Sequence, residues 1–229
     1  PFFAYLSYNT PHSPMQVPDL FWKRFSDRRL KMRNQQSPQR EIETHKRSAL
    51  AMCENIDWYV GRVLSCLERQ GVTGETIVIW FHDNGPNGVR WNGGMRGRKG
   101  STDEGGVRSP LYVRWPGHLR AGEVVPEIVS VRDLMPTLCD HAGVPETGPK
   151  PLEGLSLKPL LMKSVSSDNP WPDRVLINHW KERISARSQR FRLDDKGRLY
   201  DMVLDPAQKT DVVSRYPEIA AKLGEAAAS

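Results

Sequence analysis

The feature that most constrains the fold is an apolar run that leads directly into a segment rich in glycine and charge. Residues 76–81 are mostly β-branched or aromatic, which is typical of a strand covered on both faces. The segment Trp80–Gly106 then holds eight of the 18 glycines in the chain. Glycine costs backbone entropy on folding. Such a density after a buried strand therefore indicates either a surface loop or a polar site built at the end of that strand.

The hydrophobic pattern along the chain alternates between the strand and helix periods. This alternation predicts an α/β domain over residues 1–149, with a mostly parallel central sheet flanked by helices. Residues 150–229 predict a small C-terminal α+β subdomain with an antiparallel sheet. The expected strands are Phe2–Tyr8, Thr76–Phe81, Leu111–Trp115, Arg174–His179, Arg183–Arg187, Phe191–Asp194 and Arg198–Met202, and the expected helices are a short one within Pro18–Arg33, then Glu41–Gln70, Val131–Ala142 and Tyr216–Ala228.

Composition narrows the class of protein. The chain is 38% hydrophobic and 26% charged over 229 residues, which predicts a globular protein. No apolar run approaches the roughly 20 residues of a membrane-spanning helix, so we expect no membrane span. The three cysteines, Cys53, Cys66 and Cys139, have neither a disulfide framework nor zinc-site spacing. The sequence leaves the oligomeric state open.

The net charge of +6 favours an anionic partner, either nucleic acid or anionic sugars and sulfate esters. A basic run lies between Lys23 and Arg33, and such runs are usually solvated faces. The aromatic residues beside it, Phe21, Trp22 and Phe25, have a helical spacing that suits core packing better than base stacking. We therefore expect no nucleic-acid binding.

Polar residues follow two of the expected strands, and ligands of open α/β sheets bind beyond the carboxyl ends of strands. His12 follows the first strand, and a histidine can transfer a proton near neutral pH. Asp83 and Asn84 follow the second and offer oxygen ligands to a hard cation such as Ca²⁺ or Mg²⁺. Lys99 lies between glycines, where a compact charge can meet an anion. The alternatives are a structural histidine, an ordinary Asp-Asn-Gly turn and a solvated basic loop.

Four stretches in order make the pattern more specific, namely YNTPHSP, FHDNGP, MRGRKGSTDEGGVRSPLYVRWPG and LYDMVLDPAQKTDVV. Together they resemble the C-terminal half of type I sulfatases of the arylsulfatase group, within the alkaline-phosphatase superfamily. The resemblance implies that Asp83 and Asn84 ligate a divalent cation, usually Ca²⁺. It implies that Lys99 contacts the sulfate oxygens, and that His12 contacts the sulfate and is a candidate for protonating the leaving oxygen. The expected substrate is a small-molecule or glycan sulfate ester.

The chain departs from the family pattern at the nucleophile. The family uses a formylglycine made from a Cys or Ser in a C/S-x-P-S-R motif, and no such motif occurs in the sequence. The paired aspartates that serve as further metal ligands are absent as well. We expect the formylglycine to lie in a preceding N-terminal half and the 229-residue chain to be inactive alone. Kinship with the family implies an exported enzyme, in the periplasm, lysosome or medium.

Two other functions remain open at this point. One is a phosphodiesterase or phosphonate monoester hydrolase of the same superfamily, because the metal and lysine chemistry is shared. The other is a non-catalytic relic that binds anionic glycans. Among substrates, the sequence does not distinguish sulfated sugars, aryl sulfates and sulfolipids.

Overall fold

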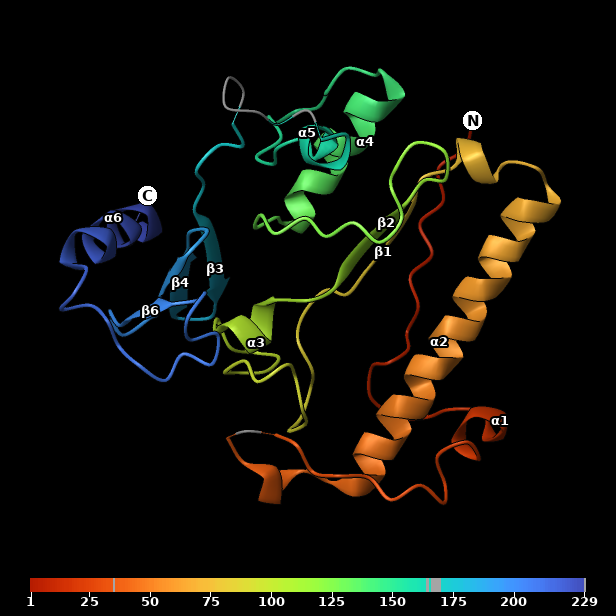
Figure 1. Cartoon of the computed structure of the whole chain (residues 1–229), viewed down its shortest axis with the longest axis horizontal. Helices are drawn as coiled ribbons and strands as arrows, with labels where there is room; N and C mark the ends of the chain where they lie inside the picture. The colour runs from red at the N-terminus through yellow and green to blue at the C-terminus, as the bar shows by residue number, and fades with distance from the viewer. Residues whose placement is uncertain (35, 164, 166–169, 229) are drawn as a thin grey trace. The chain divides into compact units, whose positions relative to one another are not determined.

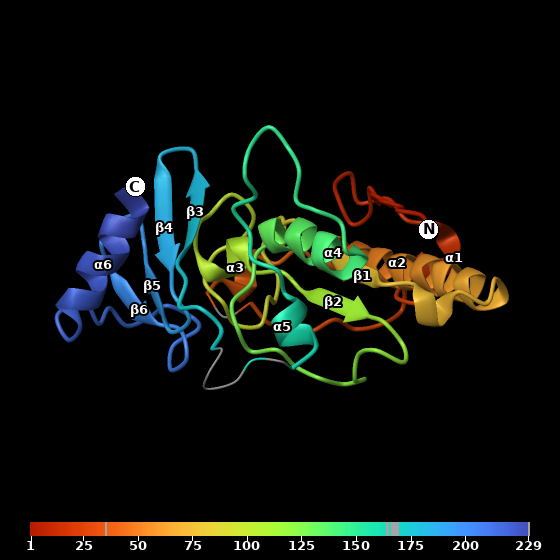
Figure 2. The same ribbon diagram turned by 90° about the horizontal axis from the view of Figure 1, so that it is seen from above.

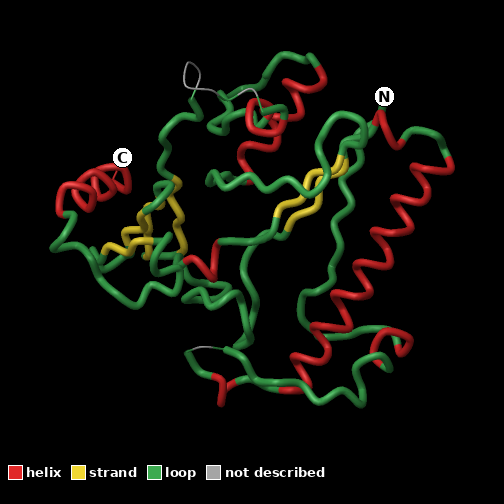
Figure 3. The backbone as a smooth tube through the Cα atoms, in the orientation of Figure 1, coloured by secondary structure: helices red, strands yellow, loops and turns green. Residues whose placement is uncertain are grey.

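The computed structural model describes residues 1–34, 36–163, 165 and 170–228. The chain divides into two compact units, Pro1–Tyr112 (unit 1) and Val113–Ser229 (unit 2). The two units are defined by how compactly each part of the chain packs. They do not test the expected domain boundary between Pro149 and Lys150, which stays a prediction. The path of the chain and its helices and strands are drawn in Figures 1 and 3.

Most of the elements expected from the sequence are present, with shorter bounds. The helices are α1 (Asp19–Trp22), α2 (Glu43–Arg69), α3 (Glu104–Val107), α4 (Leu134–Ala142), α5 (Lys158–Leu161) and α6 (Pro217–Ala228). The strands are β1 (Val78–Phe81), β2 (Leu111–Arg114), β3 (Leu176–Trp180), β4 (Arg183–Arg187), β5 (Phe191–Leu193) and β6 (Leu199–Asp201). Short 3₁₀ turns cover Pro38–Arg40, Thr73–Glu75 and Val131–Asp133.

The long helix α2 follows its sequence pattern closely. Its buried residues include Ala49, Met52 and Ile56, which are spaced by three and four and so share one face. Gly71 ends it in the left-handed conformation with φ of 69°. The Gly71 N–H donates to the Glu68 carbonyl over 2.9 Å and the Val72 N–H to the Leu67 carbonyl over 3.1 Å, a Schellman cap. None of the helices in the described parts of the chain combines the length and apolar character that crossing a bilayer requires.

The predicted first strand is wrong. Residues 1–9 form neither helix nor strand, and Phe2, Phe3 and Tyr5 are more than 60% exposed. An apolar pattern sets what a segment can bury, but a strand forms only where a second strand lies alongside to pair its backbone. β1 pairs with β2 in a two-stranded sheet. The mostly parallel central sheet therefore stays a prediction.

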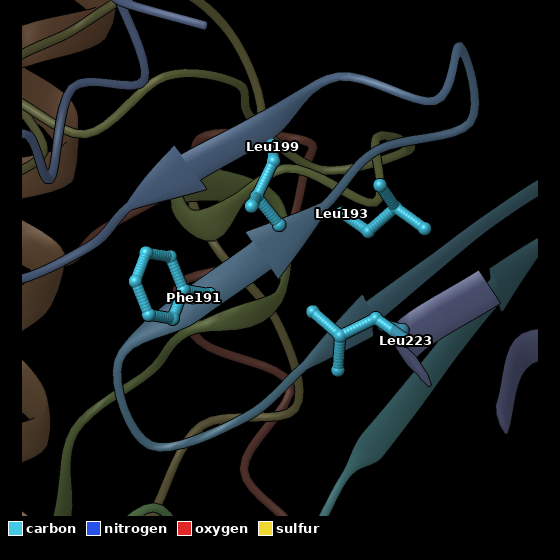
Figure 4. Packing of buried hydrophobic residues seen from close by; sticks show 5 residues of the cluster. Phe191, Leu193, Leu199 and Leu223 are labelled. Atoms are coloured by element: carbon cyan, nitrogen blue, oxygen red, sulfur yellow. The ribbon is translucent and has the colours of Figure 1, made fainter. Parts of the chain in front are cut away.

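The antiparallel sheet of unit 2 is confirmed. Its strand order is β3-β4-β5-β6, and every neighbouring pair is antiparallel. The turn at 195–197 joins β5 to β6, with Gly197 at φ of 74°, a conformation that glycine adopts without strain. Figure 2 shows α6 running beside this sheet. Its side chains close a core made with Phe191, Leu193 and Leu199, into which Leu223 projects (Figure 4).

A buried carboxylate organises the start of α4. The Asp133 side chain is fully buried and accepts from the Ser130 N–H over 2.7 Å and from the Leu155 N–H over 2.9 Å. The Arg174 guanidinium donates to both of its oxygens, over 2.8 and 3.0 Å. Ser130 and Asp133 also form a reciprocal capping box. One side chain thus connects three separate segments of unit 2.

A second buried carboxylate shapes the β5–β6 turn. Asp194 accepts from the N–H groups of Lys196 and Arg198 over 2.9 and 3.0 Å, and from the Arg198 guanidinium over 2.7 Å. Burial alone raises the pKa of this carboxyl, and the donors from Arg198 and Lys196 outweigh it, so the pKa lies below its usual value. The charged form is therefore favoured by folding.

Replacement of Asp194 by asparagine is expected to lower the free energy of unfolding by about 1.5–3 kcal/mol at neutral pH, because charge-assisted hydrogen bonds are lost. Since the folded pKa is depressed, the wild-type contribution is present above the unfolded pKa and is lost as the pH falls through the folded value. Urea unfolding at pH 7 and pH 3 should show the two proteins converging at low pH. The exposed neighbour variant Asp195→Asn is the control, and equal effects at both positions would contradict the assignment.

Candidate functional site

The glycine-rich segment after β1 folds back on itself, and its backbone atoms pack directly against one another. The Gly85 N–H donates to the Gly106 carbonyl over 2.9 Å, and the Gly105 N–H to the Arg96 carbonyl over 2.7 Å. The Lys99 N–H donates to the Pro86 carbonyl over 3.0 Å. The two ends of the segment therefore meet, and Lys99 is held beside the turn that follows β1. The segment is a built structure and not a linker.

Close backbone approach explains why glycine is required here. A Cβ on Gly85 would overlap the Gly105 carbonyl oxygen and lie 2.8 Å from its carbon. A Cβ on Gly106 would lie 2.7 Å from the Arg98 carbonyl oxygen. Both obstacles are backbone atoms, which cannot rotate away as a side chain can.

We expect Gly85→Ala to destabilise unit 1 by about 1–3 kcal/mol, because the added methyl group forces the backbone segments apart. Thermal unfolding of the purified chain measures this. Gly61→Ala is the matched control, since Gly61 lies within α2 with open space around it and alanine there should stabilise by about 0.5–1 kcal/mol. Equal effects of the two substitutions would exclude the close approach as the cause.

An ion pair holds the charged part of the segment. Arg96 donates to Asp103 through Nε over 3.0 Å and through Nη2 over 2.7 Å, with both side chains partly buried. Asp103 precedes α3, whose single turn contains Gly105 and Gly106, and glycine is unfavourable in a longer helix. The Arg96 charge is therefore neutralised within the protein, and Lys99 lies between the two partners in the sequence.

The structure brings His12 and Lys99 together from positions 87 residues apart. The Lys99 Nζ atom lies 3.3 Å from the His12 Nε2 atom. His12 sits in a turn closed by its own N–H on the Asn9 carbonyl, 2.9 Å away. Its Nδ1 atom lies 2.7 Å from the Ser13 carbonyl oxygen, which can only accept. The imidazole therefore carries its proton on Nδ1, and Nε2 faces the ammonium group.

Asp83 and Asn84 follow β1, as predicted, and lie next to the segment that anchors Lys99. The Asn84 side-chain N–H donates to the Gly85 carbonyl over 2.9 Å, which leaves the amide oxygen as its remaining polar atom. The Asp83 side chain is exposed. No contact joins these two side chains to His12 or Lys99 among the residues that the structure describes, so their place in the same site stays a prediction.

The fit of a divalent cation to these residues is partial. One carboxylate and one amide oxygen suit Ca²⁺ or Mg²⁺ in their chemistry, but Ca²⁺ takes about 6–8 oxygen ligands. Within the described ranges, no group of three or more His, Cys, Asp or Glu side chains could hold a metal ion. Asp83 and Asn84 can therefore form only part of a cation site.

His82 is a neighbour whose environment the sequence did not predict. Its ring lies edge-on to Trp80 with centroids 4.7 Å apart, and its carbonyl accepts from the Ser109 hydroxyl over 2.7 Å. Burial lowers the pKa of this imidazole, and the nearby Asp83 carboxylate opposes that effect only in part. The spacing of Trp80 in β1 and His82 just after it was the available signal, since residues two apart in extended backbone share one face.

Comparison with known families and proteins identifies what the chain resembles. Residues 1–144 match the family model described as Sulfatase, and residues 99–226 match that described as N-sulphoglucosamine sulphohydrolase, C-terminal. Steryl-sulfatase of Mus musculus is 43% identical over 118 residues, covering 47% of this chain and 19% of that protein. Arylsulfatase of Clostridium perfringens is 26% identical over 253 residues, covering 93% of this chain and 50% of that protein.

A solved structure covers nearly all of the chain. The crystal structure of Ps i-CgsB in complex with k-i-k-neocarrahexaose matches with a TM-score of 0.83 and 26% identity, over 99% of this chain and 49% of that one. The chain thus spans half the length of these relatives or less.

Proposed function

Because the chain belongs to the sulfatase family, we propose that it forms part of an enzyme that hydrolyses sulfate esters, either aryl or carbohydrate sulfates. The observation that supports this most directly is the 3.3 Å approach of the His12 imidazole to the Lys99 ammonium group. The Lys99 ammonium group and, once the imidazole is protonated, the His12 Nε2–H both donate hydrogen bonds, and they come together from separate segments. A tetrahedral anion is the kind of ligand that such a pair binds.

In this proposal Lys99 binds the sulfate oxygens and stabilises the negative charge that grows on them during the reaction. The backbone bond from Lys99 to Pro86 fixes the base of its side chain. His12 holds Nδ1 against the Ser13 carbonyl and so directs Nε2 to the substrate. In its protonated form, His12 donates the Nε2 proton to the leaving oxygen. We also propose that these residues are carried by a mostly parallel central sheet, as expected from the sequence.

Asp83 and Asn84 are proposed as two of the ligands of Ca²⁺ or another divalent cation, and the remaining ligands lie outside the described residues. When bound, such a cation supplies positive charge to the sulfuryl oxygens. The sequence holds no C/S-x-P-S-R motif, so the formylglycine nucleophile is proposed to lie outside these 229 residues. The chain alone is then inactive, and the complete enzyme is proposed to be exported.

Two measurements test the function. Inorganic sulfate added to the 229-residue chain should shift the NMR signals of the His12 ring, and the shift should be lost in Lys99→Ala. A protein that contains these residues together with a formylglycine should release sulfate from an aryl sulfate faster than phosphate from the matching phosphate ester. Preference for the phosphate ester would instead favour a phosphodiesterase or phosphonate hydrolase, and turnover by the chain alone would refute the proposed missing nucleophile.

A further inference from the structure

Several aromatic side chains, none of them part of the proposed catalytic pair, gather on the surface of unit 1. Trp58 and Tyr59 on α2 are 45% and 39% exposed, and their rings meet edge to face with centroids 4.8 Å apart. Tyr8, 41% exposed, lies 6.3 Å from the Tyr59 ring. The buried Phe21 of α1 packs against Trp58 at 6.1 Å and so supports it from beneath.

An arginine completes this cluster. The Arg62 guanidinium lies over the Trp58 ring at 5.0 Å and over the Tyr59 ring at 5.8 Å. Arg62 makes no ion pair with any carboxylate in the described ranges of the chain. The two aromatic rings contact the flat face of the guanidinium group. The N–H groups at its edge therefore stay available to an anionic acceptor. We call Tyr8, Trp58, Tyr59 and Arg62 the aromatic–arginine surface.

The segment packed along α2 adds positive charge next to this surface. Residues 23–33 contain six basic residues and one acidic one. Arg47 of α2 donates to the Phe25 carbonyl over 2.8 Å and to the Arg28 carbonyl over 3.0 Å, which fastens the segment to the helix. Of the acidic residues on this stretch of α2, Glu54 is paired with Arg24, and Asp57 is exposed. Asp57 adds one negative charge, but the six basic residues of 23–33 outnumber the three acidic ones on this face, so the local charge is positive.

We propose that the aromatic–arginine surface binds a sulfated polysaccharide, with sugar rings against Trp58 and Tyr59 and a sulfate group on Arg62. This inference rests on the proposed function, because it supplies a second contact for a polymeric substrate. Tyr8 is four residues before His12, and four residues span at most about 14 Å. A sugar chain held on Tyr8 is thus close enough to present a sulfate ester to the catalytic pair.

The test uses the full 229-residue chain and needs no turnover. Binding of heparin is measured by calorimetry, with desulfated heparin and a single-stranded oligothymidine as comparison probes. We expect Trp58→Ala and Arg62→Ala each to weaken heparin binding about fivefold to tenfold. Arg69→Ala, which removes an exposed charge from the end of the same helix, should weaken it less than about twofold. Arg62→Lys keeps the charge and should restore binding only in part.

Each outcome separates this proposal from the catalytic one. Lys99→Ala should retain most heparin binding, so unchanged turnover in that variant would count against the catalytic pair and leave the aromatic–arginine surface standing. Equal losses in Arg62→Ala and Arg69→Ala would overturn the surface, since only net charge would matter. Unchanged affinity for desulfated heparin would overturn it as well, and tighter binding of the oligothymidine would assign the surface to nucleic acid. Circular dichroism verifies that Trp58→Ala folds, and Arg62→Ala gives the same test at an exposed position.

Discussion

Replacing Asp133 by alanine is expected to lower the free energy of unfolding by about 3–5 kcal/mol. The Asp133 carboxylate is completely buried, and the Arg174 side chain opposite it is only 11% exposed. Without the carboxylate, the guanidinium is left as a charge in a low-dielectric environment with no compensating partner. The Ser130 and Leu155 N–H groups lose their acceptor at the same time. Urea unfolding followed by tryptophan fluorescence measures the change.

The neighbouring pair between Arg132 and Glu153 provides the control. It has the same charges at 2.7 Å, but its side chains are 44% and 73% exposed. Water and salt screen such a pair, so Glu153→Ala should cost less than about 1 kcal/mol. The double variant Asp133→Ala with Arg174→Ala should be less unstable than the sum of the single variants, because it removes the orphaned charge. A similar cost for Asp133→Ala and Glu153→Ala would show that burial does not govern this interaction.

Replacing Lys99 by alanine in a catalytically complete enzyme is expected to raise the barrier of sulfate-ester hydrolysis by about 3–4 kcal/mol, which corresponds to a loss of roughly 10²–10³-fold in kcat. The ammonium group is proposed to act on charge that is greatest in the transition state. The loss should therefore fall on kcat more than on KM. Steady-state kinetics with an aryl sulfate separates the two constants.

Lys196→Ala removes the same charge from the exposed β5–β6 turn and should leave kcat within about twofold. Lys99→Arg keeps the charge but replaces a compact ammonium by a planar guanidinium, so it should recover only part of the rate. An unchanged kcat in Lys99→Ala would remove Lys99 from the mechanism, whatever its distance from His12.

The parts of the fold that local chemistry decides were predictable from the sequence. The expected helix Glu41–Gln70 and the expected antiparallel sheet were both confirmed, and Gly71 and Gly197 supply the positive φ that ends the helix and turns the β5–β6 hairpin. β4 was predicted at its observed bounds. The segment Phe2–Tyr8 was predicted wrongly, since strand formation depends on a partner that a local pattern does not contain.

The candidate site, like the fold, was predictable from the sequence only where local residues decide the structure. Glycine density and the apolar run before it left a surface loop and a polar site both open, and the backbone hydrogen bonds of the structure show a built segment. The approach of Lys99 to His12 could not be derived from spacing, because 87 residues separate them and only the resemblance to sulfatases linked them. The buried partners of Asp133 and the stacking of Arg62 were not predicted, since both depend on tertiary contacts between distant segments.

The closure between Gly85 and Gly106 has a practical consequence for protein engineering. Lys99 is anchored to Pro86 by its N–H, and the residues just before it are held by the Arg96–Asp103 ion pair, so residues 87–91 lie between two fixed points. Asn87 and Trp91 are exposed there. A directed-evolution library that randomises or lengthens residues 87–91 should therefore explore new substrate preferences while Lys99 stays held at both anchors.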